Sequence, residues 1–142
     1  MILIDAGPLV ALNDLRDSAS ADCAEALAQL PNQPLLTTWP YVAEAMYLLG
    51  QSGGFEKQQA LWRNWHDDTI EFIDLTREES KLMAELMRRY QDLPMDLADA
   101  SLVAVADLRG WRKVLTLDSH FYAYRLHDGS ALEVILPTKE MP

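Results

Sequence analysis

Two acidic residues follow predicted strands at positions where carboxylates could do chemistry. Asp5 ends the predicted strand 2–5, and Asp118 ends the predicted strand 113–118. In an open parallel sheet, sites form outside the carboxyl ends of the strands, where the strand order reverses. Carboxylates that meet there could bind a hard divalent cation such as Mg²⁺ or Mn²⁺. Asp also ends strands for structural reasons, because its side chain caps nearby N–H groups, so both interpretations stay open for each residue.

A second acidic pair opens a predicted helix over residues 96–109. Asp96 is placed as the N-cap and Asp99 three residues later, as in a capping box with Asp in place of Glu. The residues after Asp99 are apolar nearly all round the helix, which predicts that the helix is buried. A carboxylate at the mouth of a buried helix is costly unless it is paired or binds a metal, although the helix dipole lowers that cost.

Glu44 lies in a predicted helix over residues 40–49. The apolar stripe of this helix falls at positions 42, 45, 46 and 49, and Glu44 lies at its edge beside Tyr41 and Tyr47. Taken alone, this position is typical of a solvated surface glutamate.

Short strand-like runs alternate with helical ones along the chain. We predict strands at 2–5, 34–37, 69–75, 113–118 and 132–136, and helices at 9–15, 19–30, 40–49, 55–66, 77–90 and 96–109. Gly50, Gly53 and Gly54 are expected to separate the third helix from the fourth. This alternation predicts an α/β fold in which a mostly parallel sheet of about five strands carries helices on both faces.

The bulk properties of the chain limit its organisation and its partners. A length of 142 residues fits a single domain over 1–142, and no apolar run is long enough to span a membrane. The start of the chain does not read as a signal peptide, and Cys23 is the one cysteine, so we expect a cytoplasmic protein. The net charge of −10 argues against a broad basic face for nucleic acid, so any grip on RNA would need local basic groups and metal ions.

Four segments together resemble a known family. They are residues 4–12 (IDAGPLVAL), 37–44 (TTWPYVAE), 95–104 (MDLADASLVA) and 115–121 (LTLDSHF). In this order and at these separations they are similar to the acidic motifs of the PIN domain, in particular of the VapC-type toxins of bacterial toxin–antitoxin pairs. The likeness runs from Ile2 to about Leu136.

The resemblance implies a PIN-like three-layer α/β fold and a Mg²⁺- or Mn²⁺-dependent ribonuclease. Asp5 and Asp99 would bind the metal directly, and Asp118 would bind a second ion or a metal-bound water. Glu44 would orient or deprotonate the attacking water. Asp96 stays open between helix cap and metal ligand.

Three further residues are expected near the substrate. Thr116 would hydrogen-bond to a group at the metal, although a Thr in a strand is equally consistent with a structural role. Arg125 is the first choice for a phosphate contact. His120 is close to the site and could contact a phosphate. By the resemblance, many relatives carry an acid at this position, and its loss could weaken a metal contact or lower activity.

The alternatives are other acid-based families and an inactive scaffold. A haloacid-dehalogenase-type phosphatase would need a second Asp two residues after Asp5, where this chain has Gly7. A response-regulator receiver would need an acidic pair after the first strand and a late Lys, and neither is suitably placed. A PIN-like module that binds RNA or protein without cutting it is the serious non-enzyme alternative, and the presence of all four acids counts against it. The resemblance also implies a homodimer and a small antitoxin that blocks the acidic pocket.

Overall fold

The computed structural model describes residues 1–30 and 32–137. Five strands and five helices alternate along the chain, with a short 3₁₀ helix near the end. Their bounds are β1 (Ile2–Ile4), α1 (Ala6–Asn13), α2 (Ser20–Gln29), β2 (Leu35–Thr38), α3 (Trp39–His66), β3 (Ile70–Ile73), α4 (Arg77–Arg89), α5 (Leu97–Arg109), β4 (Lys113–Leu115), η1 (Ser119–Tyr122) and β5 (Glu133–Ile135).

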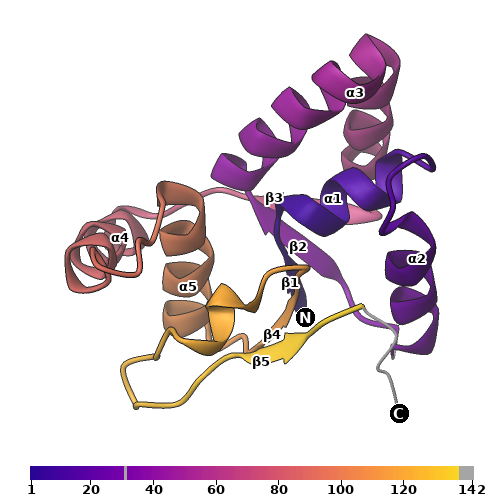
Figure 1. Cartoon of the computed structure of the whole chain (residues 1–142). Coiled ribbons are helices and arrows are strands. Elements are labelled where there is room, and N and C mark those ends of the chain that lie inside the picture. Colours follow the sequence, from indigo (N-terminus) through magenta and orange to yellow (C-terminus); the bar gives the residue numbers. More distant parts are fainter. Residues whose placement is uncertain (31, 138–142) are drawn as a thin grey trace.

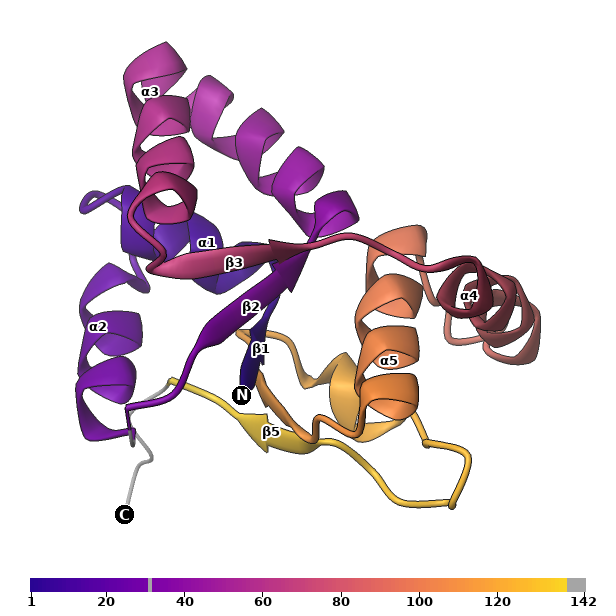
Figure 2. The same ribbon diagram turned by 180° about the vertical axis from the view of Figure 1, so that it is seen from behind.

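The five strands form one parallel sheet in the order β3-β2-β1-β4-β5. Helices α1, α2 and α3 lie on one side of this sheet, and on the other side α5 packs against the sheet while α4 packs against the outer side of α5 (Figures 1 and 2). The predicted three-layer α/β fold is therefore confirmed. Because the chain runs outward from β1 through β2 to β3 and then crosses back to β4, the strand order reverses between β1 and β4.

The core lies on both sides of the central strand. Every residue of β1 is at most 1% exposed, so this strand packs on both faces and is a continuous apolar run. On one side it meets α5, whose residues 100–106 are all completely buried. The prediction of a buried helix there is confirmed, and it means that Asp99 enters the pocket from a rigid support.

Helix α1 differs from its prediction. It was expected at 9–15, but it begins at Ala6, directly after the strand and Asp5, and it ends at Asn13. The first turn of α1 contains Gly7 and Pro8, and Pro is tolerated there because the first N–H groups of a helix have no intrahelical partner. Asp5 is therefore held between a buried strand and the start of a helix.

The predicted break at three glycines is only partly correct. Residues 39–66 are helical across Gly50 and Gly53, and the helix is kinked at Gly54, whose φ of 70° and ψ of −162° are not helical. Such a conformation is essentially restricted to glycine. Helix α3 is thus one element with two arms, and the first arm carries Glu44.

Two buried hydroxyls attach this first arm to the rest of the site. Thr38, the N-cap of α3, shares a 2.6 Å hydrogen bond with Ser101 of α5. Thr37 donates to the carbonyl oxygen of Ile4 at 2.7 Å. These contacts fix the start of α3 against both β1 and α5. Within the described residues, no helix is long and apolar enough to cross a membrane.

Candidate active site

One pocket, of about 570 Å³, gathers all five predicted site carboxylates. It opens at the carboxyl ends of the paired strands β1 and β4, where the strand order reverses. Its lining residues are Asp5, Ala6, Gly7, Tyr41, Glu44, Leu48, Pro94, Asp96, Asp99, Leu117, Asp118, Ser119 and His120. The expectation that Asp5 and Asp118 follow adjacent strands is confirmed, although β4 ends at Leu115 and Asp118 lies in the loop beyond it.

Asp5 is the most buried of these acids, with 7% of its surface exposed. It occupies the N-cap position of α1, but its side chain makes no capping hydrogen bond, so the structural interpretation of this residue is wrong. Its Oδ2 accepts a 2.5 Å hydrogen bond from Thr116, as expected for that hydroxyl. Its Oδ1 is buried without a hydrogen-bond partner. A buried carboxylate oxygen without a partner is costly, and a bound cation would relieve that cost.

Burial raises the pKa of the Asp5 carboxyl from its ordinary value of 3.8 to about 7. The hydrogen bond from Thr116 opposes this rise, whereas the negative charges of Asp99, Asp118 and then Glu44 reinforce it. The same environment that disfavours the carboxylate would favour a bound cation, which removes both the desolvation cost and the repulsion.

The sequence left two roles open here, helix cap and metal ligand, and Asp96 and Asp99 differ in their hydrogen bonds. Asp96 caps α5, since its carboxylate accepts a 2.7 Å hydrogen bond from the Asp99 N–H, and it also lines the pocket. Asp99 does not complete a reciprocal capping box. Its Oδ1 accepts instead from the hydroxyl of Tyr41, and its Oδ2 accepts from that of Tyr124 at 3.2 Å. Burial raises the pKa of Asp99, against the hydrogen bond from Tyr41.

Glu44 reaches the pocket from α3, one helical turn after Tyr41. Its side chain is exposed, as the sequence pattern indicated, yet it faces the acids of α5. Partial burial raises its pKa, and the charges of Asp96 and Asp99 add to the effect. A carboxylate whose pKa is raised in this way is a better proton acceptor than an ordinary surface glutamate.

Asp118 is held by its own loop. It is the N-cap of η1, and its Oδ1 accepts a 2.9 Å hydrogen bond from the His120 N–H. Its Oδ2 lies 3.0 Å from Nδ1 of the same histidine. His120 therefore lines the pocket as expected, but it lies against an acid and not free for an incoming phosphate.

The assignment of Arg125 to this pocket is not supported by its position. Its guanidinium donates to the carbonyl oxygens of Tyr122 and Tyr124, at 2.6 and 3.0 Å. These contacts turn it back on its own loop, and it is absent from the pocket lining. The sequence placed it near the site because it follows Asp118 closely, but the intervening 3₁₀ turn redirects the chain.

The carboxylate oxygens of the pocket are suitable ligands for a hard divalent cation, although they are not already arranged around one metal position. Among residues 1–30 and 32–137, no group of three or more His, Cys, Asp or Glu side chains is arranged to hold a metal ion as it stands. The oxygen ligands are of the kind that Mg²⁺ and Mn²⁺ prefer. Together with the unpartnered Asp5 oxygen, they indicate a site whose acids would turn inward on a cation.

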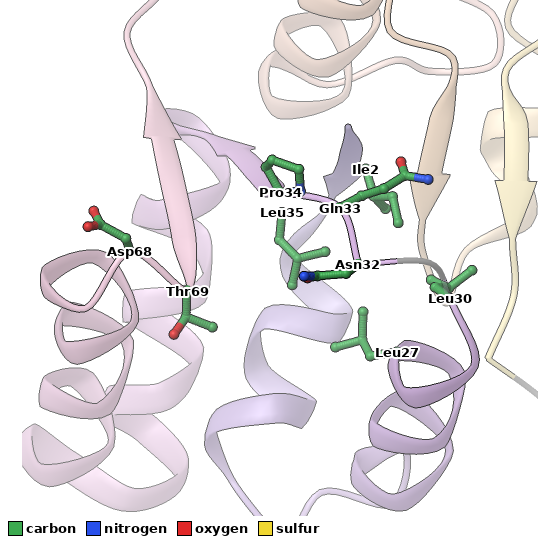
Figure 3. Close-up of a pocket in the computed structure, with 9 residues that line it drawn as sticks. All are labelled: Ile2, Leu27, Leu30, Asn32, Gln33, Pro34, Leu35, Asp68 and Thr69. Atoms are coloured by element: carbon green, nitrogen blue, oxygen red, sulfur yellow. The ribbon is translucent and has the colours of Figure 1, made fainter.

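A larger pocket, of about 640 Å³, lies at the opposite edge of the sheet (Figure 3). It is formed at the amino ends of the strands by Ile2, Leu27, Leu30, Asn32, Gln33, Pro34, Leu35, Asp68 and Thr69. Asp68 is its one ionisable side chain among these residues, and apolar groups make up much of the wall. This pocket lacks the clustered carboxylates of the first pocket. The larger of the two pockets is therefore not the candidate active site.

Two site residues were missed by the sequence analysis. Tyr41 and Tyr124 are 3% and 1% exposed, and both donate to Asp99. Buried aromatic residues normally indicate core packing, so composition gave no reason to select them. The one available signal was that Tyr41 precedes Glu44 by three positions and so shares its helix face.

Comparison with known proteins gives consistent results for family and fold. The model of the PIN domain family matches residues 2–126. The chain is 31% identical over 139 residues to ribonuclease VapC26 of Mycobacterium tuberculosis, covering 94% of this chain and 99% of that protein.

Solved structures share the fold at low sequence identity. The sarcin-ricin loop cleaving toxin VapC20 of Mycobacterium tuberculosis superposes with a TM-score of 0.72 at 18% identity, over 82% of this chain and 88% of that one. A toxin–antitoxin complex from Klebsiella pneumoniae gives a TM-score of 0.68 at 18% identity, over 99% and 100% of the two chains. With its parallel sheet and its acidic pocket at the reversal of strand order, the chain belongs to the PIN-domain family.

Proposed function

We propose that this protein is a divalent-metal-dependent endoribonuclease and the toxin of a toxin–antitoxin pair. The observation that carries the proposal is the convergence of Asp5, Glu44, Asp96, Asp99 and Asp118 on one pocket at the carboxyl ends of β1 and β4. The relative named as a ribonuclease, similar over nearly the whole chain, supports the same reaction class.

The cation would be held by carboxylates from three parts of the chain. Asp5 and Asp99 are assigned as direct ligands. Both carboxylates are removed from water at least in part, and both are repelled by neighbouring carboxylates, so a cation would relieve both effects. Asp118 is assigned to a second ion or to a metal-bound water, and Asp96 can add a further oxygen while it caps α5. Bound Mg²⁺ or Mn²⁺ would activate a water and neutralise charge that develops on the phosphate.

The chain's own groups then have distinct tasks. Glu44, with its raised pKa and exposed side chain, takes the proton from the attacking water. Thr116 fixes the Asp5 carboxylate through Oδ2 and accepts from the Asp118 N–H at 2.9 Å, so one hydroxyl couples the two acids. His120 holds the other end of Asp118.

An RNA substrate must approach a pocket that repels it. The chain carries a net charge of −10, and the pocket concentrates acids, so phosphate contacts depend on the cation. This dependence predicts that metal binding precedes productive RNA binding. It also separates the enzyme from a PIN-like module that binds RNA without metal.

The decisive experiment is cleavage of single-stranded RNA by purified protein in Mg²⁺ or Mn²⁺ and in EDTA. Cleavage should occur with metal and stop in EDTA. Asp5→Asn and Asp99→Asn should each abolish it, because the amide keeps the shape but loses the charge that holds a hard cation. Asp22→Asn on α2, outside the pocket, is the matched control and should cleave normally. RNA binding without cleavage by the wild type in metal would instead favour the inactive module.

The partner proposal rests on complexes of proteins with the same fold. A toxin–antitoxin complex of Klebsiella pneumoniae and VapBC2 of Rickettsia felis bound to a promoter DNA fragment share the fold of this chain. These complexes support a small antitoxin, which we expect to cover the acidic pocket, and the resemblance to the family is the motive for expecting a homodimer. Light scattering should give twice the chain mass of 16.1 kDa, and native purification should yield a small co-purifying protein. A monomer at high concentration with no such partner contradicts both expectations.

A further inference from the structure

We infer that Tyr41 and Tyr124 are positioning residues for the metal site, whose hydroxyls hold the Asp99 carboxylate in the orientation that a cation requires. The inference rests on the proposed function, since it concerns the same pocket. It adds two residues that do not themselves carry the charge of the site.

The contacts place one hydroxyl on each oxygen of the carboxylate. Tyr41 donates to Oδ1 of Asp99, and Tyr124 donates to Oδ2. The two donors come from different parts of the chain, α3 and the segment after η1, and they meet the acid in the first turn of α5. Three separate segments are thereby joined at a single side chain.

Both donors are rigid. Tyr41 and Tyr124 are 3% and 1% exposed, so neither ring can turn its hydroxyl to solvent. The ring of Tyr124 packs edge-on against Tyr90 and Phe121, with centroids 5.1 and 5.6 Å away. The Tyr90 hydroxyl in turn accepts from the Arg125 N–H at 2.8 Å, which fastens the loop that carries Tyr124.

The chemistry of phenol groups suits this task. Each phenol hydroxyl carries one hydrogen, which it donates to the Asp99 carboxylate. A carboxylate oxygen has two lone-pair sites, and one donor on each oxygen leaves one site free on each. The donors therefore fix the rotation of the carboxylate without using up its capacity for a cation.

Asp99 depends on such external support more than Asp96 and Asp118 do. Asp96 and Asp118 are each held by a backbone N–H of their own helix or loop. Asp99 lies at the third position of α5, yet its own side chain makes no capping bond, and its two oxygens accept instead from the hydroxyls of Tyr41 and Tyr124. Groups that orient a metal-binding carboxylate typically contribute about 10- to 100-fold to metal affinity.

The test measures Mn²⁺ binding to the full chain without RNA, by isothermal titration calorimetry. Tyr41→Phe and Tyr124→Phe remove one oxygen each and keep the rings. We expect the Kd for Mn²⁺ to rise about 10-fold in each variant and towards 100-fold in the double variant. Tyr122→Phe is the matched control, because this ring lies in the same loop, is 50% exposed and is outside the pocket lining. Its Mn²⁺ affinity should equal that of the wild type.

A second readout separates positioning from a purely structural role. In RNA cleavage, both variants should need more Mn²⁺ for half-maximal rate, and excess metal should restore most of the wild-type rate. A structural role would lower the metal-free melting temperature and leave the metal dependence unchanged. Melting curves in EDTA accompany every variant for this reason.

The possible outcomes distinguish failure of this inference from failure of the proposed function. Unchanged Mn²⁺ affinity in both variants overturns the inference alone and leaves the proposed function standing. Tighter binding also overturns it, because the hydroxyls would then compete with the cation. If Tyr41→Phe does not fold, Tyr124→Phe decides the matter, and failure of both to fold counts against positioning. A wild type that binds no Mn²⁺ overturns the proposed metal site and this inference together.

Discussion

Asp5 and Asp96 both precede a helix, but only the Asp96 side chain caps the helix that follows it. The Asp96 carboxylate accepts the Asp99 N–H at 2.7 Å, whereas Asp5 makes no capping bond to α1 and leaves Oδ1 unpartnered. The difference follows from position, because Asp5 leaves a buried central strand and Asp96 leaves an exposed loop. The sequence left capping and function both open for Asp5 and favoured a cap for Asp96, and the hydrogen bonds separate the two residues.

At the residue scale, the raised pKa of Asp5 predicts that the metal-free protein loses stability as the pH rises. Because the folded pKa of about 7 lies above the ordinary value of 3.8, the folded state binds this proton more tightly. The contribution of Asp5 to stability is therefore present below about pH 4 and lost as the pH rises to about 7. Asp5→Asn removes this dependence and should be as stable as the wild type at low pH and more stable at pH 7.5. By linkage the difference is at most about 4 kcal/mol.

The measurement is urea denaturation in EDTA at several pH values between 4 and 8. The quantity of interest is the free energy of unfolding of the variant minus that of the wild type, which cancels the titration of other groups. This difference should grow with pH and level off above pH 7. Glu25→Gln on the exposed face of α2 gives the baseline. A difference that is flat or shrinks with pH contradicts the assignment.

Asp96 and Asp99 should respond differently to the same substitution. Asn is as good an N-cap as Asp, so Asp96→Asn keeps the bond to the Asp99 N–H and should fold with a stability change within about 0.5 kcal/mol. Its cleavage rate should fall moderately, since one peripheral negative charge is lost. Asp99→Asn should abolish cleavage. Parallel rate measurements at fixed Mn²⁺ check the ranking, and equal losses in both variants would make Asp96 a full ligand.

The acids of the site were predictable from the sequence, whereas the groups that hold them were not. Asp5, Glu44, Asp99 and Asp118 stand in the motifs that resemble the family, and all four line one pocket. The hydroxyls on Asp99 come from residues 58 positions before it and 25 positions after it, so they depend on tertiary packing. Proximity along the chain was misleading for Arg125, which contacts its own backbone.

At the scale of the element, the alternation of strands and helices was predicted correctly and the boundaries of α1 and α3 were not. The error in α3 came from three glycines that were expected to break the helix, and α1 begins three residues earlier than predicted. Pro8 sits in the first turn of α1, where it costs little, and Gly50 and Gly53 remain within the first arm of α3. Intrinsic propensity is a weak prior for such residues because packing against the sheet can override it.

Gly54 is the exception, and it gives a prediction for α3. Its φ of 70° and ψ of −162° lie in a region that only glycine adopts readily, and a Cβ there would meet open space. Gly54→Ala should therefore destabilise the protein through backbone strain alone, by roughly 1–3 kcal/mol. Glu56→Ala, in the same helix two residues later at an exposed position, should change the free energy of unfolding little. Chemical denaturation of both variants tests this, and a neutral Gly54→Ala would mean that the kink is not required.

At the scale of the whole molecule, the acidic site lowers the stability of the folded protein when no metal is bound. The protein carries a net charge of −10, and the pocket collects five carboxylates, of which Asp5, Glu44 and Asp99 have raised pKa values. This cost is tolerated because the sheet and the buried helix α5 hold the acids in place. A ligand that binds only the folded state then recovers stability.

Metal binding should therefore raise the melting temperature of the wild type. With free Mn²⁺ at about 100 times Kd, linkage predicts a gain of about 2.7 kcal/mol, which corresponds to roughly 10 °C for a domain of this size. Asp5→Asn should start at an equal or higher melting temperature in EDTA, because the repulsion is gone, and it should gain much less from Mn²⁺. The control Asp22→Asn should gain as much as the wild type. Differential scanning calorimetry in EDTA and in Mn²⁺ provides the comparison, and an equal gain in Asp5→Asn would place the cation outside this pocket.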